Sequence, residues 1–401
     1  MTNRTMKETE RIQGQGGPGR GGPMGGGMIA QKPLEFGPSA KRLMAQLRPQ
    51  LPKVVGVFLF GVVSVALSAV GPKVLGRATD LIFAGVIGKQ LPPGITKEQA
   101  IQGAIANGQP QIAELLSGVD LIPGQGIDFR AVGIVLLVVL ALYTVSAILA
   151  YFQGYLLNDV VQGTIYRLRS DVESKLNRLP LSYFDRQPRG ELLSRVTNDI
   201  DNVSQSLQQT MSQMLTSILT IIFVVGMMFW ISPSLALIAL VTIPVTMVVA
   251  GLVMKRSQTH FVTQWRKTGV LNSQVEEAFT GHSLVKVFGR QEEVQESFEV
   301  ENEALFEASF SAQFLSSLIM PIMMFIGNLN YVVIAVVGGL RVASGTMSLG
   351  DVQAFIQYSR QFTQPVTQVA SMINLLQSGV ASAERVFELL DADEEKPDHH
   401  L

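Results

Sequence analysis

The sequence predicts an all-α membrane protein, and three observations carry that prediction. The chain of 401 residues is 47% hydrophobic and only 16% charged, whereas a soluble domain carries about 25% charged residues. Several apolar runs are long enough to cross the ~30 Å hydrocarbon core of a bilayer as helices. Charged, amphipathic stretches continue several of these runs. Helices that are apolar first and then polar indicate spans that project well beyond the membrane.

The composition also excludes several classes of protein. The formal net charge is −1, which does not favour a nucleic-acid binder. The chain has no cysteine, which excludes disulfides and thiolate metal ligands. None of the four histidines is spaced with carboxylates as a metal site requires, so we expect no metal site. No pattern of a catalytic triad or of a metalloprotease occurs, and we expect no catalysis by this chain.

The N-terminal residues 1–38 contain the run GQGGPGRGGPMGGGM. They are predicted to form a disordered arm, because glycine and proline at this density cannot build a packed core. Basic residues then precede the first apolar run, which extends from Val54 to about Ile87: Lys41, Arg42, Arg48 and Lys53. Lysine and arginine beside a span mark its cytoplasmic side, so we expect the N-terminus inside the cell.

Residues 88–128 interrupt the apolar pattern with LPPG, NGQPQ and IPGQG. They predict a long external loop, and their shortage of basic residues agrees with that side of the membrane. A short amphipathic helix is expected at 97–116. A cap packed on the outer helix ends is the favoured role of this loop, and a dedicated substrate site is the alternative.

The rest of the chain predicts five further long helices. Residues 129–179 are apolar first and then charged, and about fifty residues rise roughly 75 Å at 1.5 Å each. This second helix must therefore protrude far into the cytoplasm. Residues 191–230, 235–254 and 314–340 supply the third to fifth spans, and residues 348–390 form the sixth helix. Six spans place both termini on the cytoplasmic side of a multi-pass protein of the cell membrane.

Two polar segments, here called knees, join the projecting helices. The first has the sequence LPLSYFDRQPRGELLSRVTNDIDNV at 179–203. Its Ser182-x-x-Asp185 is a capping-box pattern, and the following proline and glycine end the helix within about a turn or two. The prediction is a short helix that presents Tyr183 and Phe184 at an exposed tip. The second knee has the sequence NSQVEEAFTGHSLVKVFGR at 272–290.

Three sequences at these helix ends resemble the transmembrane domain of type IV ATP-binding cassette (ABC) exporters, which move drugs and lipids. They are YFDRQPRGELLSRVTNDI at 183–200, EEAFTGHSLVKVFGRQ at 276–291, and GTMSLGDVQAFIQY followed by ASAERVFELLD. The resemblance covers residues 39–391. It implies a dimer of two half-transporters, identical or different, that exchange the hairpin of the fourth and fifth spans.

The resemblance further implies that the two knees contain coupling helices, at about 180–190 and 268–281, that contact nucleotide-binding domains. An aromatic anchor in a pocket can transmit push and pull, while polar neighbours fix its orientation. The residues that would make these contacts are Tyr183, Phe184, Asp185, Glu191, Glu276, Glu277 and Phe279.

The chain departs from full-length half-transporters at its end. No phosphate-binding loop of the form G-x-x-x-x-G-K-[ST] occurs in the sequence. By the resemblance, ATP and Mg²⁺ would be bound by a nucleotide-binding domain outside this chain. Residues 392–401 stand where the linker to that domain would lie, which favours a truncation over a separate ATPase subunit. The chain itself is then no enzyme, whereas the full-length protein would be an ATP-hydrolysing translocase.

Polar side chains within the predicted spans indicate a path through the membrane. Arg360 would lie roughly 18 Å below the outer turn at 1.5 Å per residue, and a charge at that depth must face water or a partner. Pro365 would give the sixth helix a bending point. Hydrogen bonds between helices are the alternative role for each polar side chain. The residues predicted to line a substrate cavity are Gln213, Asn328, Asn330, Tyr331, Gln353, Gln357, Tyr358, Arg360 and Gln361.

These observations lead to one expectation of function and two alternatives. We expect the permease domain of an ATP-driven exporter, which would move amphipathic drugs or lipids by alternating access. A lipid or fatty-acid importer of the same fold is the first alternative. A membrane scaffold or channel without ATP coupling is the second.

Overall fold

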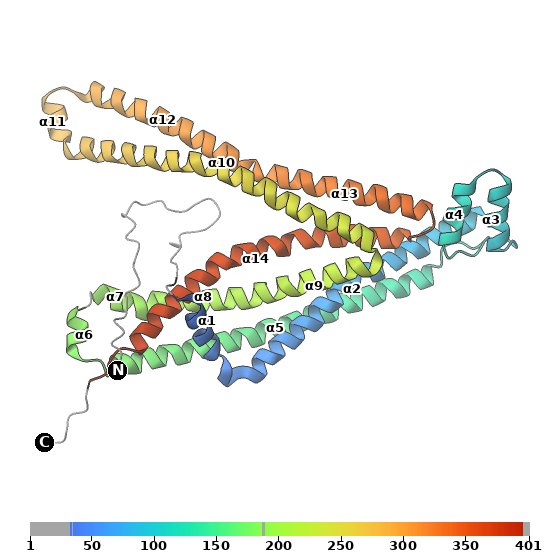
Figure 1. Cartoon of the computed structure of the whole chain (residues 1–401), viewed down its shortest axis with the longest axis horizontal. Coiled ribbons are helices and arrows are strands. Elements are labelled where there is room, and N and C mark those ends of the chain that lie inside the picture. The colour runs from blue at the N-terminus through green and yellow to red at the C-terminus, as the bar shows by residue number, and fades with distance from the viewer. Residues whose placement is uncertain (1–32, 34, 187–188, 396–401) are drawn as a thin grey trace, which may run out of the picture. The chain divides into compact units, whose positions relative to one another are not determined.

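The computed structural model describes residues 33, 35–186 and 189–395. All regular secondary structure in these residues is helical (Figure 1), as the sequence predicted. Most of the arm predicted for 1–38 lies outside the described residues. Its end does not: helix α1 begins at Phe36 and runs to Ala45, so the predicted boundary at residue 38 is wrong.

The described residues divide into two compact units, which are treated separately below. Unit 1 holds the chain up to Trp230 and again from Ser348, and unit 2 holds Ile231–Met347. The helices of unit 1 are α1, η1 (Arg48–Gln50), α2 (Leu51–Gln90), α3 (Lys97–Ala106), α4 (Pro110–Gly118), α5 (Phe129–Leu176), α6 (Leu181–Arg186), α7 (Arg189–Ser194), η2 (Arg195–Asp199), α8 (Ile200–Gln209), η3 (Thr210–Met214), α9 (Leu215–Ile231) and α14 (Leu349–Leu390). Those of unit 2 are α10 (Pro233–Thr280), α11 (His282–Val287), α12 (Gln291–Ser317) and α13 (Ile319–Ala343).

Five described helices or helix runs are long and apolar enough to cross a bilayer: Arg48–Gln90, Phe129–Leu176, Leu192–Ile231, Pro233–Thr280 and Gln291–Ala343. They coincide with the first five predicted spans. The sixth expected span falls on α14, which has sufficient length at 42 residues. Glutamines and Arg360 make its first half too polar to be identified by hydropathy, so a sixth crossing stays a prediction.

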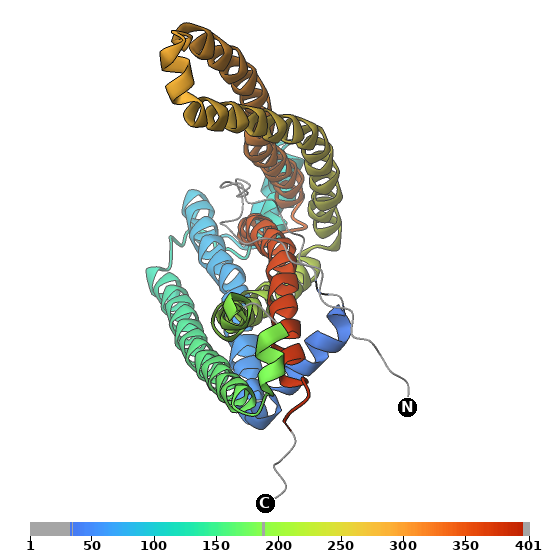
Figure 2. The ribbon, with the colours of Figure 1, turned by 90° about the vertical axis from the view of Figure 1, so that its left-hand side faces the viewer.

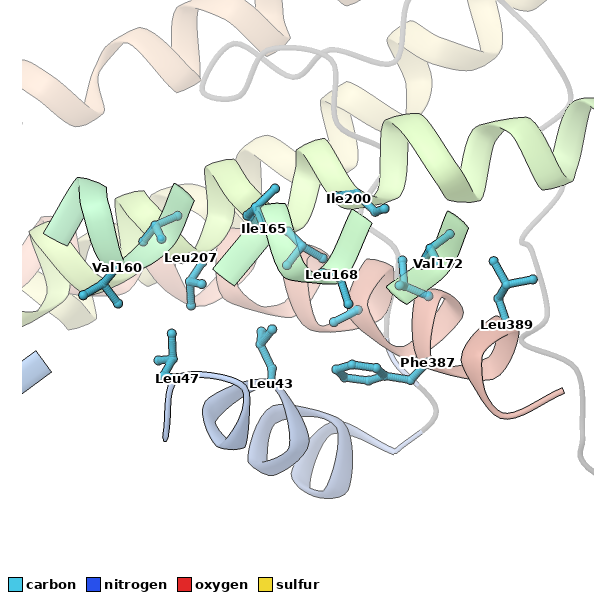
Figure 3. Close-up of a cluster of buried hydrophobic side chains, with 14 of the residues drawn as sticks. Leu43, Leu47, Val160, Ile165, Leu168, Val172, Ile200, Leu207, Phe387 and Leu389 are labelled. Carbon is cyan, nitrogen blue, oxygen red and sulfur yellow. The ribbon is translucent and has the colours of Figure 1, made fainter. Parts of the chain in front are cut away.

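The core of unit 1 lies where α1, α5, α8 and the end of α14 meet (Figure 3). Val160, Val161, Ile200 and Leu389 are fully buried in this cluster. Apolar residues three and four apart on each helix face the cluster, as helical periodicity requires. Figures 1 and 2 show α1 crossing beside the end of α14 instead of running along the bundle.

Helix α1 is fixed to α14 by charge as well as by apolar contact. Arg42 donates two hydrogen bonds to the carboxylate of Asp391, at 2.5 and 2.8 Å. Its guanidinium carbon also lies 4.4 Å from the centre of the Phe387 ring, in a cation–π geometry. The hydrogen bond from Arg42 lowers the pKa of the Asp391 carboxyl, and the same bond raises the pKa of Arg42. Opposite charges that bond directly each favour the ionised state of the other.

Two glycines let the backbones of α2 and α14 touch near the start of α14. A side chain at Gly350 would collide with the Gly76 carbonyl and would lie 2.7 Å from a carboxylate oxygen of Asp80. The Gly350 amide donates a 2.6 Å hydrogen bond to that Asp80 carboxylate, and Lys73 forms an ion pair with Asp351. Glycine at position 350 therefore permits the close contact between α2 and α14, and the Gly350–Asp80 hydrogen bond and the Lys73–Asp351 ion pair fix it.

The predicted external loop folds into a helical hairpin of two helices, α3 and α4, where the sequence indicated one. Thr96 and Gln99 form the reciprocal hydrogen bonds of a capping box at the start of α3. Gly108, with a φ of +72°, turns the chain between the helices. Alanines and leucines of the hairpin pack against Ile87 and Leu91 at the end of α2. The hairpin is a cap on the helix end, which agrees with the favoured role.

Unit 2 is an antiparallel hairpin of α10 against α12 and α13 (Figure 1). Lys267 and Glu301 form an ion pair at 3.3 Å, and Gln274 donates a hydrogen bond to Ser297. At the other end of the unit, Arg341 donates a 2.9 Å hydrogen bond to the Ser232 hydroxyl. Unit 2 has two membrane-length helix runs, Pro233–Thr280 and Gln291–Ala343, and only 6% of the most apolar part of each is buried. Lipid or further protein must therefore cover most of this apolar surface.

Candidate functional site

The first knee is a pair of short helices, α6 and α7, between α5 and α8. Tyr183 and Phe184 meet edge to face, with ring centres 6.1 Å apart. Both rings are half-buried against the unit 1 core, so the expectation of two exposed rings at the tip is wrong. Helix α6 lies against the core, and these adjacent positions occupy its inner face. The exposed side chains are Leu181, Ser182 and Asp185 instead.

Leucines take the outward position that the aromatic residues were expected to hold. Leu181 is 80% exposed and Leu193 of α7 is 65% exposed. The side chain of Glu191, also predicted as a coupling residue, lies outside the described side chains. The first knee therefore presents two exposed leucines, one on each of its short helices. We call α6 and α7 together the first hairpin tip.

The second knee differs from its predicted boundaries. Residues 268–281 were expected to form the short coupling helix, but α10 continues without interruption to Thr280. The separate short helix is α11, His282–Val287, and it joins α10 to α12 in Figure 1. Nothing between Asn272 and Thr280 breaks a helix, whereas Gly289, with a φ of +67°, ends the short helix. The sequence EEAF therefore belongs to the final turns of α10.

Exposed apolar residues gather around α11. Phe279 is 83% exposed, Leu284 62%, Val287 79% and Phe288 71%. Charged side chains surround this apolar group: Glu276, Glu277 and Lys286 are exposed on the adjoining turns. Glu276, Glu277 and Leu284 line a shallow groove together with Ser273, Thr280 and Gly281. We call residues 276–288 the second hairpin tip.

An ion pair between Arg290 and Glu293 lies next to the second hairpin tip and favours the ionised form of the Glu293 carboxyl. Arg290 donates hydrogen bonds to Glu293, one of them 2.8 Å long from its Nε atom. This hydrogen bond lowers the pKa of the Glu293 carboxyl. The carboxylate therefore stays ionised at neutral pH, beside the exposed apolar group.

The predicted cavity residues of α14 do not share one environment. Tyr358 is fully buried, and its hydroxyl donates a 2.5 Å hydrogen bond to the Ala69 carbonyl of α2. It is a packing residue between helices, so its prediction as a cavity residue is wrong in this structure. Gln353 accepts a hydrogen bond from Thr79 of α2. Gln357 and Gln361 are half-buried, and Arg360 is exposed.

The other predicted cavity residues lie on other helices. Gln213 is exposed on η3, a π-helical segment of unit 1. Asn328 and Tyr331 are exposed on α13 and Asn330 is half-buried there, so these three belong to unit 2. Apart from Tyr358, these side chains are accessible, and their lining of a cavity stays a prediction.

Sequence reasoning missed a buried polar contact between η2–α8 and α14. Asp199 is 7% exposed and forms an ion pair with Arg385. The signal was present as matching helical spacing: Asp199, Asn202 and Ser206 on one helix, and Ser378, Ser382 and Arg385 on the other. Polar residues at i, i+3 or i+4, and i+7 share a helix face.

Comparison with known proteins identifies the family. A model of the ABC transporter transmembrane region matches residues 54–366. The "Fatty acid ABC transporter ATP-binding/permease protein" of Mycobacterium tuberculosis is 52% identical over 364 residues, which is 91% of this chain and 58% of that protein. An uncharacterised ABC transporter ATP-binding protein of Bacillus subtilis is 34% identical over 89% of this chain and 52% of its own length.

Lipid flippases are more distant relatives. An "ATP-dependent lipid A-core flippase" of Desulfotalea psychrophila is 30% identical over 65% of this chain and 46% of its own length. The chain thus spans about half the length of the relatives that it matches. With membrane-length helices, projecting hairpins and a family model over most of its length, this chain belongs to the family of ABC transporter transmembrane regions.

Proposed function

We propose that this chain forms the membrane path of an ATP-driven transporter for amphipathic lipids. One observation carries the proposal: two of the membrane-length helices are more than twice as long as a bilayer crossing requires, and each leads into short helices at a hairpin tip. Helices α5 and α10 each have 48 residues, or about 72 Å at 1.5 Å per residue, against a hydrocarbon core of ~30 Å. A helix of that length can carry movement from a distant contact into the membrane.

The contacts that would receive this movement are the two hairpin tips. Each presents exposed apolar anchors, Leu181 and Leu193 on the first and Phe279 and Phe288 on the second. We propose that nucleotide-binding domains dock here, bind ATP and Mg²⁺, and move the tips when they close. The names of the relatives, which join an ATP-binding and a permease function, support this pairing.

The assembly is proposed to contain two half-transporters, with identical or different chains. The hairpin of unit 2 would then reach across to the second half-transporter. Its separation as a compact unit and its low burial support this arrangement. Basic residues gather before the first span and at the helix ends that adjoin the two tips. We therefore propose that the termini and both tips lie on the cytoplasmic side of the cell membrane.

Fatty acids are the first substrate class to test, because the relative at 52% identity is named for them. The test is a flux measurement in proteoliposomes that hold this chain together with its ATP-binding domains. ATP added on the side of the tips should drive a labelled long-chain fatty acid across the membrane. Movement away from the tips would establish export, and movement toward them would establish import.

Two results would overturn the proposal. Flux without ATP would indicate a channel, and the absence of substrate-stimulated ATP hydrolysis together with the absence of flux would indicate a scaffold. A drug-like amphipath that competes with the fatty acid would extend the substrate class without changing the mechanism.

A further inference from the structure

A buried polar seam joins the helix that follows the first hairpin tip to the C-terminal third of α14. Three of its residues, Asp199, Asn202 and Ser206, lie on η2 and α8. The other three, Ser378, Ser382 and Arg385, lie on α14. All except Asn202, which is half-buried, are less than 9% exposed. We call these six residues the polar seam.

The contacts of the polar seam are specific in geometry. Arg385 binds both carboxylate oxygens of Asp199, with its Nε atom 2.9 Å from one of them. Its terminal nitrogen also donates a 3.0 Å hydrogen bond to the Ser382 hydroxyl. Asn202 donates a 2.7 Å hydrogen bond to that same hydroxyl, and the Ser206 hydroxyl donates a 2.9 Å hydrogen bond to the Leu375 carbonyl. Asn202 also donates a 3.1 Å hydrogen bond to the Ser378 hydroxyl. Five residues of the seam therefore form a connected network and not a single ion pair, and Ser206 bonds to the α14 backbone beside it.

The backbones of α8 and α14 lie so close together that the size of the side chains between them is also constrained. Gly379 faces Ser206, and a Cβ at this glycine would collide with the serine side chain. One turn beyond the seam, Arg195 and Glu388 are 3.6 Å apart and extend the charge pairing toward the tip. Arg195 directly follows α7, the second helix of the first hairpin tip. Helix α7 thus continues directly into η2 and α8, which are fixed to α14.

Further ion pairs hold the end of α14 in place. Asp391 binds Arg42 of α1, and Glu394 lies 3.0 Å from Lys175 of α5. The end of α14 is consequently bound on several sides, and the polar seam is the side that leads to the tip. A buried ion pair is weak evidence for net stability, because desolvation offsets the attraction. Its fixed bidentate geometry instead defines how two helices are placed.

We infer that the polar seam is a positioning element, which makes α7 of the first hairpin tip and the C-terminal end of α14 move as one rigid body. This inference rests on the proposed function and deepens it. A force applied at the tip would reach α14 directly, and a displacement of α14 would reorient the tip. The residues act through helix placement and do not touch substrate.

The absence of native cysteine makes a distance measurement direct. Spin labels are placed at Leu193→Cys on α7 of the tip and at Asp393→Cys after α14, two exposed positions, in the chain reconstituted in lipid nanodiscs. A second label pair, Asp171→Cys with Asp393→Cys, reports α5 against the same end of α14. We expect a single narrow distance distribution for each pair in the parent chain.

Asp199→Asn removes the charge of the seam and keeps its shape. We expect the distribution from tip to α14 to broaden at least twofold in width, while the distribution from α5 to α14 stays narrow. Asp201→Asn is the matched control, because Asp201 lies two residues further along, at the start of α8, but forms an exposed ion pair with Arg169. This control should leave both distributions unchanged.

A second variant keeps the test valid if Asp199→Asn alone does not fold. The double variant Asp199→Asn with Arg385→Gln removes both charges, so no unpaired charge is buried. It should fold and still broaden the distribution from tip to α14. A distribution that stays narrow in every folded seam variant would overturn the inference, as would broadening of the control pair to the same extent. Failure of the proposed function would appear separately, as absent ATP-driven flux in the unaltered protein.

Discussion

Gly350→Ala provides a strong test of how α14 is held against α2. The new methyl group would collide with the Gly76 carbonyl and would lie 2.7 Å from a carboxylate oxygen of Asp80. Backbone atoms cannot rotate away as a flexible side chain can, so the helices must separate. Overpacking of this kind costs about 1–3 kcal/mol. Separation would also weaken the charge-assisted hydrogen bond from the Gly350 amide to Asp80, worth about 1.5–3 kcal/mol.

The opposing term is small. Alanine stabilises a helix interior over glycine by about 0.5–1 kcal/mol. The net expectation is a loss of about 2–4 kcal/mol in the free energy of unfolding. Gly154→Ala is the matched control, because a Cβ at this position of α5 meets nothing within 4 Å. The control should gain about 0.5–1 kcal/mol.

The assay is thermal unfolding of the chain in nanodiscs, followed by the loss of monodisperse protein. At roughly 2–4 °C per kcal/mol, the two variants should differ by about 5–20 °C, with Gly350→Ala the less stable. Equal midpoints would refute the close approach of α2 and α14 and the account of how α14 is positioned.

Three further predictions concern the tips and α1. Phe279→Ser should change stability by less than about 0.5 kcal/mol, because the ring is 83% exposed, yet it should lower substrate-stimulated ATP hydrolysis at least tenfold; full stimulation would remove Phe279 from the docking contact. Tyr183→Ala should instead cost about 1–2 kcal/mol of stability, since its ring is half-buried in the core, and an unchanged unfolding midpoint would contradict that placement. Arg42 lowers the pKa of Asp391 in the folded protein, so the ion pair stabilises the attachment of α1 at pH values above the unfolded carboxyl pKa of about 3.9. This stabilisation should fade as the pH falls below that value, and amide exchange in residues 36–45 should become faster. Asp391→Asn should abolish this pH dependence.

Much of the fold could be predicted from the sequence because the bilayer constrains it strongly. A membrane-spanning segment must satisfy its backbone within the segment, so a long apolar run becomes a helix. The first five predicted spans accordingly coincide with membrane-length helices. The sixth was harder because α14 buries much of its surface against other helices and carries polar residues that hydropathy counts against it.

The positions of the tips were less predictable, for physical reasons. At the first tip, the sequence indicated a short helix but not which face would meet the core, so Tyr183 and Phe184 were assigned to the wrong side. At the second, the sequence EEAF resembled a separate helix, although nothing before Gly281 stops α10. Helix ends depend on local capping, and several choices can be close in energy.

Contacts between distant segments were the least visible in the sequence. Asp199 and Arg385 are separated by 186 positions, and helical spacing alone does not say which polar faces meet. Tyr358 shows the same difficulty, since its hydroxyl donates a hydrogen bond to the Ala69 carbonyl, 289 positions earlier in the chain. Polar residues in membrane helices can face a cavity or another helix, and only the packing decides between these roles.

The central claim is that this chain moves a lipid when ATP-driven domains displace its hairpin tips. Its most direct test is ATP-dependent flux of a labelled fatty acid in proteoliposomes, compared between the parent protein and Phe279→Ser. The account predicts flux that requires ATP in the parent and falls at least tenfold in the variant, although both fold equally well. ATP-independent flux, or equal flux in the two proteins, would contradict it.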